Sequence, residues 1–423
     1  MRVLLLNQTF YPDTASSAQH ATDLAASLVK AGHQVVVLTS RRAYDSPSLV
    51  FARNEIMDGV RILRLRSTSF GKSAHWRRAL DFASFYLSCA LQLMLLPRCD
   101  VVVAMTSPPL ISFLAGLYVR VKGGSLLSWI LDLNPDEAIA AGALDAGSLL
   151  ARVMARLLQF SLSSSATVVA LDRFMRDRLV AKGVPDRKIL VLPPWAHDGA
   201  VRYDQAARVR FRTEHGIADR FVVMYSGNHS PCHPLNTLLG AARELSAERN
   251  VVFVFVGGGS QFQMVREFAS RNSLGNVLCL PCQPLEGLAG SLSAADLHVA
   301  VMGDAFVGIV HPCKIYNILA TGCPYLYVGP SPSHITEIAR TGATDSAHYA
   351  RHGDIASVAS VIRAAAARGR RRCPAHHESA RRFSTAALVS RLVAAIERMP
   401  LREQSPNFAP ELHTARDAQT VVS

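Results

Sequence analysis

The stretch Val-Leu-Leu-Leu-Asn-Gln at residues 3–8 leads through a loop of small and polar residues (9–15) into a polar segment at 16–20. An apolar run, a loop and then a helix, here from about Ser17, is typical of a buried strand in a parallel sheet covered on both faces. The run is too short for the core of a secretory signal, and no small-residue cleavage site follows it. We therefore expect a buried first strand and no leader.

The same alternation of apolar runs and amphipathic stretches extends over most of the chain. The predicted strands are 2–7, 34–40, 60–65, 100–104, 125–130, 167–170 and 188–192, and then 221–226, 251–256, 276–280, 296–301 and 324–328. Pro193 and Pro194 interrupt the pattern, because paired prolines continue neither a helix nor a central strand. The sequence therefore predicts an α/β protein with two doubly wound, Rossmann-like parallel sheets and a hinge near 193–200.

The predicted domains follow from this interruption. The first domain covers 1–195 and the second 196–375, and a helical segment follows at 376–398. Residues 399–423 are polar and broken by proline, so we expect a disordered tail there.

Composition narrows the functional classes. Of the 423 residues, 49% are apolar and 18% are charged, which excludes a largely disordered chain. Eight cysteines at irregular spacings exclude a disulfide-stapled scaffold, so we expect reduced thiols in the cytoplasm and a structural role for Cys279 and Cys282. The net charge of +13 favours phosphorylated substrates or an anionic membrane over nucleic acid, because no nucleic-acid motif is visible.

Two segments bear on membrane contact. Residues 79–97 approach the length of a membrane span, but they contain a polar stripe at helical spacing, formed by Asp81, Ser84, Ser88 and Gln92. A helix packed on a sheet exposes such a stripe, which favours a packed helix over a membrane span or a monotopic anchor. The arginine-rich residues 363–382 suit either docking on an anionic bilayer or a solvated linker.

Residues that can carry chemistry gather where predicted strands end, which is where open α/β sheets bind ligands. After the first strand, Ser16 and Ser17 lie at a helix N-terminus that favours an anion, or serve only as its N-cap. The second domain opens with a strand that ends in a glycine turn at 225–229. Asp132 follows a strand of the first domain and is a candidate acceptor-side carboxylate.

A second glycine turn, Gly257-Gly258-Gly259, follows the next strand. It partly satisfies G-x-G-x-x-G, but Phe262 stands where the third glycine belongs, and no acidic residue ends the following strand to hold a ribose. The hypothesis that the protein is an NAD-dependent oxidoreductase depends on this partial fingerprint alone.

The stretch from Met302 to Pro324 carries the densest chemistry. A glycine-containing loop holds Asp304, and His311 and Pro312 precede Lys314 at the expected start of a helix. A lysine at the positive end of a helix is suited to hold a diphosphate and to stabilise it as it leaves. The alternative is a solvated lysine on a helix surface.

Taken in order, several motifs resemble those of the glycosyltransferases of family 4, which have the GT-B fold. They are residues 7–20, 106–109 (Thr-Ser-Pro-Pro), 132–137 (Asp-Leu-Asn-Pro-Asp-Glu), 192–195 (Leu-Pro-Pro-Trp), 225–228 (Tyr-Ser-Gly-Asn), 294–296 (Ala-Ala-Asp), 311–316 (His-Pro-Cys-Lys-Ile-Tyr) and 320–322 (Ala-Thr-Gly). The resemblance covers roughly residues 1–398 and extends to the branch that builds bacterial surface polysaccharides and lipid-linked oligosaccharides.

The resemblance implies a hexosyltransferase whose second domain binds a nucleotide diphospho-sugar and whose first domain holds a lipid-linked or polysaccharide acceptor. It implies transfer with retention of anomeric configuration, without a cofactor or an essential metal, and a C-terminal helix that returns to the first domain. The sequence contains no D-x-D pair to clamp a metal and a diphosphate. We expect a cytoplasmic enzyme that contacts the inner face of the membrane peripherally and binds no nucleic acid.

The expected site residues combine both lines of argument. Lys314 and His311 are assigned to the diphosphate, Asp304 to the donor sugar, and His20 and Asp132 to the acceptor side. The acceptor side also includes Ser16 and Ser17, and the remaining donor-side candidates are Gly227, Asn228, His229, Gly257, Gly258, Val310 and Pro312.

The chain departs from the family pattern at three places. Asn317 replaces the second of two paired glutamates, and Ala15-Ser16-Ser17 replaces paired glycines. A loop with His229, Cys232 and His233 stands where an arginine and a lysine are usual. These departures leave open a non-catalytic scaffold that binds nucleotide weakly. A GT-B epimerase or phosphorylase is a further alternative, although a phosphorylase would need a pyridoxal-phosphate lysine, for which we find no convincing candidate.

Overall fold

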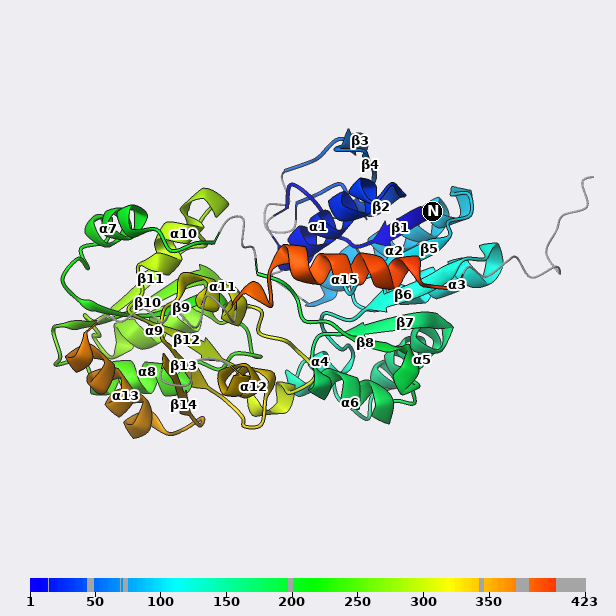
Figure 1. Cartoon of the computed structure of the whole chain (residues 1–423). Coiled ribbons are helices and arrows are strands. Elements are labelled where there is room, and N and C mark those ends of the chain that lie inside the picture. The colour runs from blue at the N-terminus through cyan, green and yellow to red at the C-terminus, as the bar shows by residue number, and fades with distance from the viewer. Residues whose placement is uncertain are drawn as a thin grey trace, which may run out of the picture.

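The computed structural model describes residues 1–13, 15–43, 49–68, 70, 75–196, 201–341, 346–369 and 380–400. Two α/β halves lie side by side, each built around its own sheet (Figure 1). The predicted disordered tail beyond residue 400 and the basic residues 370–379 lie outside the described residues.

The first sheet has eight strands in the order β3-β4-β2-β1-β5-β6-β7-β8. They are β1 (Arg2–Leu6), β2 (Gln34–Ser40), β3 (Asn54–Met57), β4 (Val60–Leu65), β5 (Val101–Ala104), β6 (Ser125–Trp129), β7 (Ser165–Ala170) and β8 (Ile189–Val191). All neighbours pair in parallel except β3 with β4. The helices of this half are α1 (Ser16–Lys30), α2 (His75–Leu95), α3 (Ser112–Lys122), α4 (Asp136–Ala140), α5 (Leu149–Ser164), α6 (Arg173–Ala181) and the short η1 (Asp186–Lys188).

The second sheet has six parallel strands in the order β11-β10-β9-β12-β13-β14. They are β9 (Phe221–Asn228), β10 (Val251–Gly258), β11 (Val277–Leu280), β12 (Leu297–Val301), β13 (Tyr325–Val328) and β14 (Ala347–Ala350). Its helices are α7 (Gln205–Glu214), α8 (Asn236–Glu244), α9 (Phe262–Arg271), α10 (Leu285–Ser293), η2 (Asp304–Phe306), α11 (Lys314–Thr321), α12 (His334–Thr341) and α13 (Ile355–Arg368). The predicted pair of doubly wound parallel sheets is confirmed.

Each predicted strand is present, but the sequence analysis missed β3 and β14. β3 is a half-exposed edge strand joined to β4 by Asp58 and Gly59, both with positive φ. This Asp-Gly turn is a known hairpin signal and could have revealed β3. β14 is only four residues long and has no such flanking signal. At α1, the N-cap is Ala15 and not the expected serine, and no side chain caps the helix.

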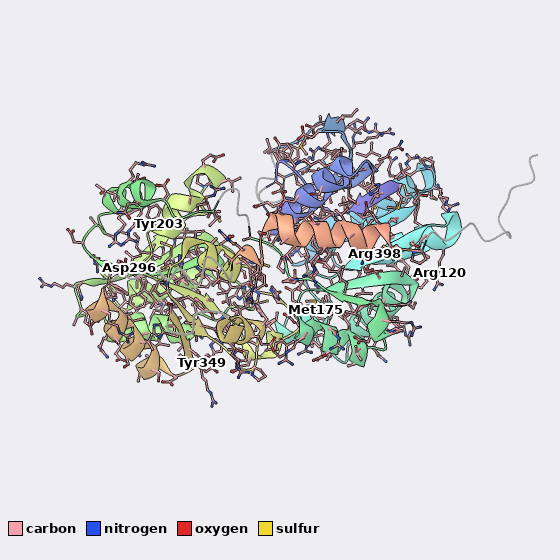
Figure 2. All side chains as sticks on the ribbon, in the orientation of Figure 1. Arg120, Met175, Tyr203, Asp296, Tyr349 and Arg398 are labelled. Carbon is pink, nitrogen blue, oxygen red and sulfur yellow. The ribbon has the colours of Figure 1, made fainter. Side chains whose placement is uncertain are left out.

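The last helix, α15 (Thr385–Glu397), returns to the first domain and packs beside α1 (Figure 1). The N–H of Ala196 donates to the Phe383 carbonyl oxygen (2.8 Å), and the Thr385 hydroxyl donates to the Ala196 carbonyl oxygen (3.0 Å). Arg398, just after this helix, lies over the first half of the molecule, whereas Asp296 lies in the second (Figure 2). The predicted return of the C-terminal helix is thus confirmed.

The structure describes both segments that were considered for membrane contact, the second only in part. The predicted helix at 79–97 is α2, packed on the first sheet as expected, and Asp81, Ser84 and Ser88 of its polar stripe form hydrogen bonds with residues 66–70. Within the arginine-rich segment, Arg363 forms ion pairs with Glu244 and Glu248 of the α8 region. No helix in the described ranges is long and apolar enough to cross a bilayer.

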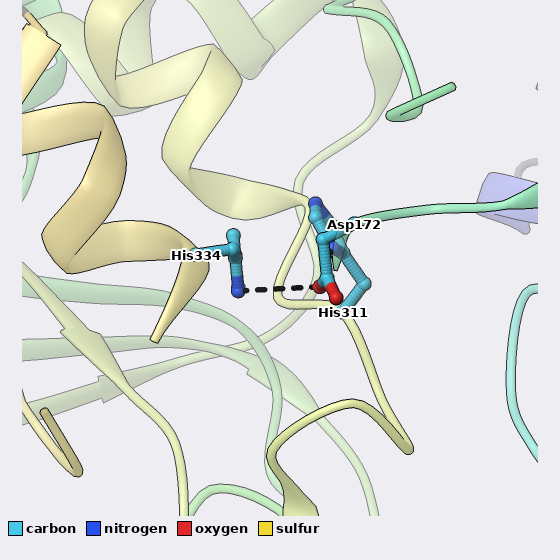
Figure 3. Close-up of side chains that lie close together, drawn as sticks. All are labelled: Asp172, His311 and His334. Carbon is cyan, nitrogen blue, oxygen red and sulfur yellow. Dashed lines mark hydrogen bonds and ion pairs between the residues drawn. The ribbon is translucent and has the colours of Figure 1, made fainter. Parts of the chain in front are cut away.

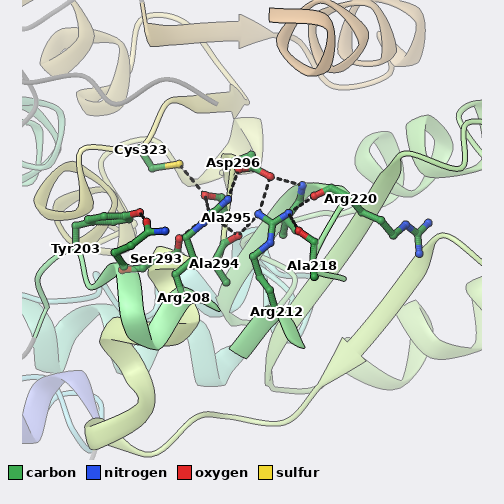
Figure 4. Close-up of polar contacts among 12 residues, drawn as sticks. Tyr203, Arg208, Arg212, Ala218, Arg220, Ser293, Ala294, Ala295, Asp296 and Cys323 are labelled. Carbon is green, nitrogen blue, oxygen red and sulfur yellow. Dashed lines mark hydrogen bonds and ion pairs between the residues drawn. The ribbon is translucent and has the colours of Figure 1, made fainter. Parts of the chain in front are cut away.

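A buried ion network joins α7 to β12 (Figure 4). The Asp296 carboxylate accepts hydrogen bonds from Arg208 (2.6 Å), Arg212 (2.9 Å) and the backbone N–H of Val222 (2.8 Å). Arg208 also donates to three consecutive carbonyl oxygens at 293–295. Because both guanidinium groups are buried, Asp296 is their necessary counter-charge.

We expect Asp296→Ala to lower the free energy of unfolding by about 3–5 kcal/mol, because it leaves two buried arginines without a counter-charge. Denaturant titration followed by circular dichroism measures this change. The control is Glu267→Ala, which removes an exposed i,i+4 ion pair with Arg271 and should cost less than about 1 kcal/mol. Equal effects of the two variants would contradict the assigned role of Asp296.

Candidate active site

Lys314 begins α11 at the carboxyl edge of the second sheet and faces the end of β9. Its Nζ donates a hydrogen bond to the Tyr225 hydroxyl (2.6 Å) and lies 3.9 Å from the centroid of that ring. Burial lowers the pKa of Lys314 to about 7. The amine is therefore only partly charged near neutral pH until an anion joins it.

The glycines at this edge are required by close approach of the backbone. Gly227 has φ +139°, and a Cβ there would lie 3.4 Å from the Lys314 Nζ. A Cβ at Gly257 would lie 2.2 Å from the Gly227 carbonyl oxygen, and one at Gly259 would lie 2.3 Å from Oδ1 of Asn228. Packing of β9 against β10 therefore accounts for the glycines of the partial dinucleotide fingerprint.

Two buried histidines lie beside Lys314. The His229 ring packs edge-on against Tyr225 and Phe262, with centroids 4.9 and 4.8 Å apart, and His233 Nδ1 lies 2.8 Å from the Val301 carbonyl oxygen. Burial, and then the Lys314 charge, lowers the pKa of His229 to about 4 and the pKa of His233 well below its ordinary value. Both rings are neutral near pH 7 and add no charge beside Lys314.

The loop that leads into α11 pairs with the first domain. The N–H of Leu133 donates to the Ile309 carbonyl oxygen (2.9 Å), and Asp132 and Val310 form an isolated antiparallel bridge. Pro312 is buried at the end of this loop, two residues before α11 begins. The candidates Val310 and Pro312 thus shape the backbone next to Lys314.

The same loop also contacts α6. Nε of Arg178 donates to the Val307 carbonyl oxygen (2.7 Å). Gly308 has φ +72°, and a Cβ there would lie 2.6 Å from backbone atoms of Phe174, so no larger residue fits without displacing α6. The lysine-bearing end of α11 is therefore positioned by both domains.

His311 lies in a buried triad at this domain boundary and does not face open space (Figure 3). Its Nδ1 is 2.8 Å from Oδ2 of Asp172, its Nε2 is 2.6 Å from the Tyr316 hydroxyl, and its ring stacks on His334 with centroids 3.9 Å apart. Asp172 also caps α6 by accepting from the N–H of Met175 (2.8 Å). Both ring nitrogens of His311 are thus engaged by protein groups.

In the triad of Asp172, His311 and His334, hydrogen bonds keep the Asp172 carboxylate ionised. Burial by itself would raise the pKa of Asp172, but the hydrogen bond and charge of His311, and then His334, lower it to about 2. Burial lowers the pKa of His334 well below its ordinary value of 6.5.

Asp172, His311 and His334 are also the group of described residues whose ligand atoms lie close enough to hold a metal ion, all within 4.8 Å of one another. The two rings are stacked with 26° between their planes, so their lone pairs lie in nearly parallel, separate planes. A tetrahedral metal needs lone pairs that converge. The arrangement therefore fits a hydrogen-bonded triad better than a metal centre.

Asp132 lies across the domain boundary from the start of α11. Burial, and then the charge of Glu137, raises the pKa of Asp132 to about 8. Glu137 accepts a hydrogen bond from Asn134 (2.8 Å), and its Oε1 lies 3.9 Å from Sγ of Cys232 in the second domain. A half-buried carboxyl with a pKa near neutral pH can exchange a proton with a bound hydroxyl group.

Other candidates lie apart from this cluster. His20 is buried in the first domain, with its ring edge-on to Trp195 at a centroid distance of 4.7 Å. Ser16 is exposed, and the Ser17 hydroxyl lies 2.9 Å from that of Thr9. Asp304 is exposed beside a cavity of about 430 Å³, whose lining includes Asn236, Thr237 and His352 but neither Lys314 nor Gly227. The roles assigned to these residues stay predictions.

Sequence reasoning missed three residues that the fold brings to the site. Tyr225 was part of a quoted motif, but its contact with Lys314 depends on the distance between β9 and α11. Asp172 comes two residues after a predicted strand and precedes a helix, so N-cap preference could have singled it out. No local signal marks His334, which reaches the triad from α12.

The sequence pattern of the glycosyl transferase 4-like domain matches residues 17–195. Residues 17–195 therefore carry a glycosyl transferase 4-like domain. The resemblance predicted from the motifs is thereby confirmed, and the match ends at Trp195, where the paired prolines led us to end the first domain.

Relatives and solved structures agree with this assignment. The chain is 22% identical over 341 residues to the putative colanic acid biosynthesis glycosyl transferase WcaI of Escherichia coli, covering 76% of this chain and 82% of that one. It is 24% identical over 241 residues to the probable glycosyltransferase WbjE of Pseudomonas aeruginosa, covering 57% and 60%. The structure of Anabaena HepE with UDP-glucose superposes with a TM-score of 0.68 at 14% identity, over 94% of this chain and 99% of HepE. The GT-B arrangement of this glycosyltransferase is confirmed.

We expect His334→Gln to flatten the pH dependence of stability between about pH 6.5 and 5. The folded state keeps His334 neutral, so below 6.5 the unfolded chain binds more protons and stability falls, by about 1.4 kcal/mol per pH unit for one such group. Denaturant titrations across this range measure the slope. In His215→Gln, the control outside the triad, the wild-type slope should remain; a wild-type slope in His334→Gln would refute the proposed neutral ring.

Proposed function

We propose that this glycosyltransferase moves a sugar from a nucleotide diphospho-sugar to a lipid-linked or polysaccharide acceptor in the synthesis of a cell-surface polysaccharide. The observation that carries the proposal is Lys314 at the start of α11, held against Tyr225 and facing the glycine turn that ends β9. The relative WcaI, named for colanic acid biosynthesis, and the HepE complex with UDP-glucose support the same function.

The donor diphosphate would bind in front of Lys314. The amine and the N-terminal N–H groups of α11 supply positive potential, and the absence of a side chain at Gly227 leaves room beside the amine. Because the neighbouring histidines are neutral, Lys314 carries most of the stabilisation of the leaving diphosphate. His311 acts as a positioning residue, since its ring is held between Asp172 and Tyr316 three residues before Lys314.

The acceptor would enter from the first domain beside Asp132. Its carboxyl lies at the bridge to Val310, and its raised pKa suits transient acceptance of the proton from an acceptor hydroxyl. Hexosyl transfer, retention of configuration and independence from a metal are carried by the family resemblance and belong to the proposal. Peripheral contact with the inner face of the membrane also rests on the family resemblance and is part of the proposal.

Binding of a nucleoside diphosphate should take up a proton between pH 7 and 9. The pKa of Lys314 is about 7 in the free protein, and a bound diphosphate raises it, so observed affinity should fall by up to about tenfold per pH unit over this window. Calorimetry of UDP and GDP in buffers of different ionisation enthalpy measures the uptake. Lys314→Met should abolish it; binding without proton uptake in the wild type would contradict the assigned contact.

The decisive test of function is sugar transfer by Lys314→Met, with purified protein, radiolabelled nucleotide sugars and a membrane extract as the acceptor source. We expect turnover to fall by about a hundredfold or more, because a preorganised charge on the leaving group is removed. Exposed Lys30→Met, at the end of α1, is the matched control and should retain activity. Unchanged turnover in Lys314→Met would refute the proposal, and nucleotide binding without any wild-type transfer would favour the scaffold.

A further inference from the structure

Helix α2 has apolar side chains on two opposite faces. The inner face, with Phe85, Cys89 and Leu93, is buried in the core beneath β1, β2 and β4. An ordinary crossover helix turns its polar residues outward from such a core. Here the outward face is also apolar.

The polar stripe of α2 lies between these two faces and is used by the chain itself. Asp81 accepts from the N–H of Phe70 (2.9 Å), Ser84 lies 2.9 Å from the Thr68 hydroxyl, and Ser88 donates to the Arg66 carbonyl oxygen (2.7 Å). These bonds fix the rotation of the helix. They leave the second apolar face in contact with solvent.

The outward face consists of large apolar residues at intervals of three, four and seven, which all fall on one side of a helix. Their exposed fractions are 60% for Trp76, 47% for Leu80, 64% for Leu87, 51% for Leu91 and 65% for Met94. Neighbouring α3 adds Leu117 and Val121, at 40% and 61%. The two helices are joined where Nζ of Lys122 bonds to the Met94 and Leu96 carbonyl oxygens. We call this surface of α2 and α3 the outer apolar face.

Basic side chains border the outer apolar face. Arg77 and Arg78 are exposed at one end of α2, and Arg98 and Arg120 are exposed near the other. Asp81, whose carboxylate is engaged by the Phe70 N–H, is the single acidic residue in the sequence of α2, and α3 has none. A tryptophan and arginines beside an apolar stripe match the interface of an anionic bilayer, where apolar groups enter the acyl boundary and arginines meet the headgroups.

The position of this face on the first sheet, relative to Asp132, supports the same occupant. α2 follows β4, so its first turn, with Trp76, lies at the carboxyl edge of the first sheet. Asp132 follows β6 at that same edge. An acceptor attached to a lipid in the membrane would therefore emerge at the same edge of the first sheet as Asp132.

We infer that the outer apolar face of α2 and α3 docks this protein on an anionic lipid bilayer. The role we give to this docking, delivery of a lipid-linked acceptor, rests on the proposed function. The observations that support the docking itself do not depend on that function. The inference places the docking surface on α2 and α3 and not on the arginine-rich segment near the C-terminus.

Vesicle flotation tests the inference with the full chain and with vesicles of phosphatidylcholine, alone or mixed with phosphatidylglycerol. We expect binding to the anionic vesicles that weakens as salt is raised. Leu87→Glu/Leu91→Glu should lower vesicle affinity by about tenfold or more, because two apolar groups are replaced by like-charged carboxylates. Val209→Glu/Leu285→Glu makes the same change at 53% and 43% exposed positions of the second domain and should bind as the wild type does.

The charge requirement has its own pair of variants. Arg77→Gln/Arg78→Gln should reduce the preference for anionic vesicles, whereas Arg187→Gln/Arg210→Gln, at exposed positions elsewhere, should leave it unchanged. Calorimetry of UDP and GDP with the same proteins separates docking from function. A wild-type chain that binds vesicles but no nucleotide would count against the proposed function alone.

Three results would overturn the inference. One is a wild-type chain that does not float with anionic vesicles, and another is equal binding by Leu87→Glu/Leu91→Glu and its control. The third is a wild-type dimer, seen by sedimentation, that Leu87→Glu/Leu91→Glu makes monomeric without any vesicle binding, which would assign the face to a second copy of the chain.

Discussion

The hydrogen bond between Asp172 and His311 is the constraint on which the arrangement of the two domains depends. One carboxylate caps α6 of the first domain and orients a ring of the second, three residues before Lys314. The loop at 307–310 adds backbone contacts to α6 and to residues 132–133. Because these groups are buried, separation of the domains would leave polar atoms without partners, and the lysine-bearing end of α11 would lose its support.

Around Lys314 the protein keeps the local charge low until a ligand arrives. Burial holds its pKa near 7, and the adjacent histidines are neutral. Burial, and then the charge of Glu137, raises the pKa of Asp132, across the domain boundary, to about 8. A lysine and a carboxyl that both titrate near neutral pH suit a site in which an anion departs and a proton is transferred.

The two faces of the first sheet are covered by different helices (Figure 1). α1 and α15 cover one face of this sheet, and the separate core under α2 and α3 covers the other. The polar stripe of α2 binds residues 66–70, which turns apolar side chains outward along the helix. The sequence contains both the stripe and the apolar residues, but only the tertiary bonds decide which of them meets solvent.

The sequence by itself determined the two parallel sheets, because strand and helix periodicity and the glycine turns are local properties. It placed Lys314 at a helix N-terminus for the same reason. The return of the last helix to the first domain came from the family resemblance and not from a local pattern. Only the tertiary structure decided that His311 is held by Asp172 and Tyr316, that His20 is buried against Trp195, and that Asp304 lies by a separate cavity. Those outcomes depend on distances between segments far apart in the chain, which no local pattern encodes.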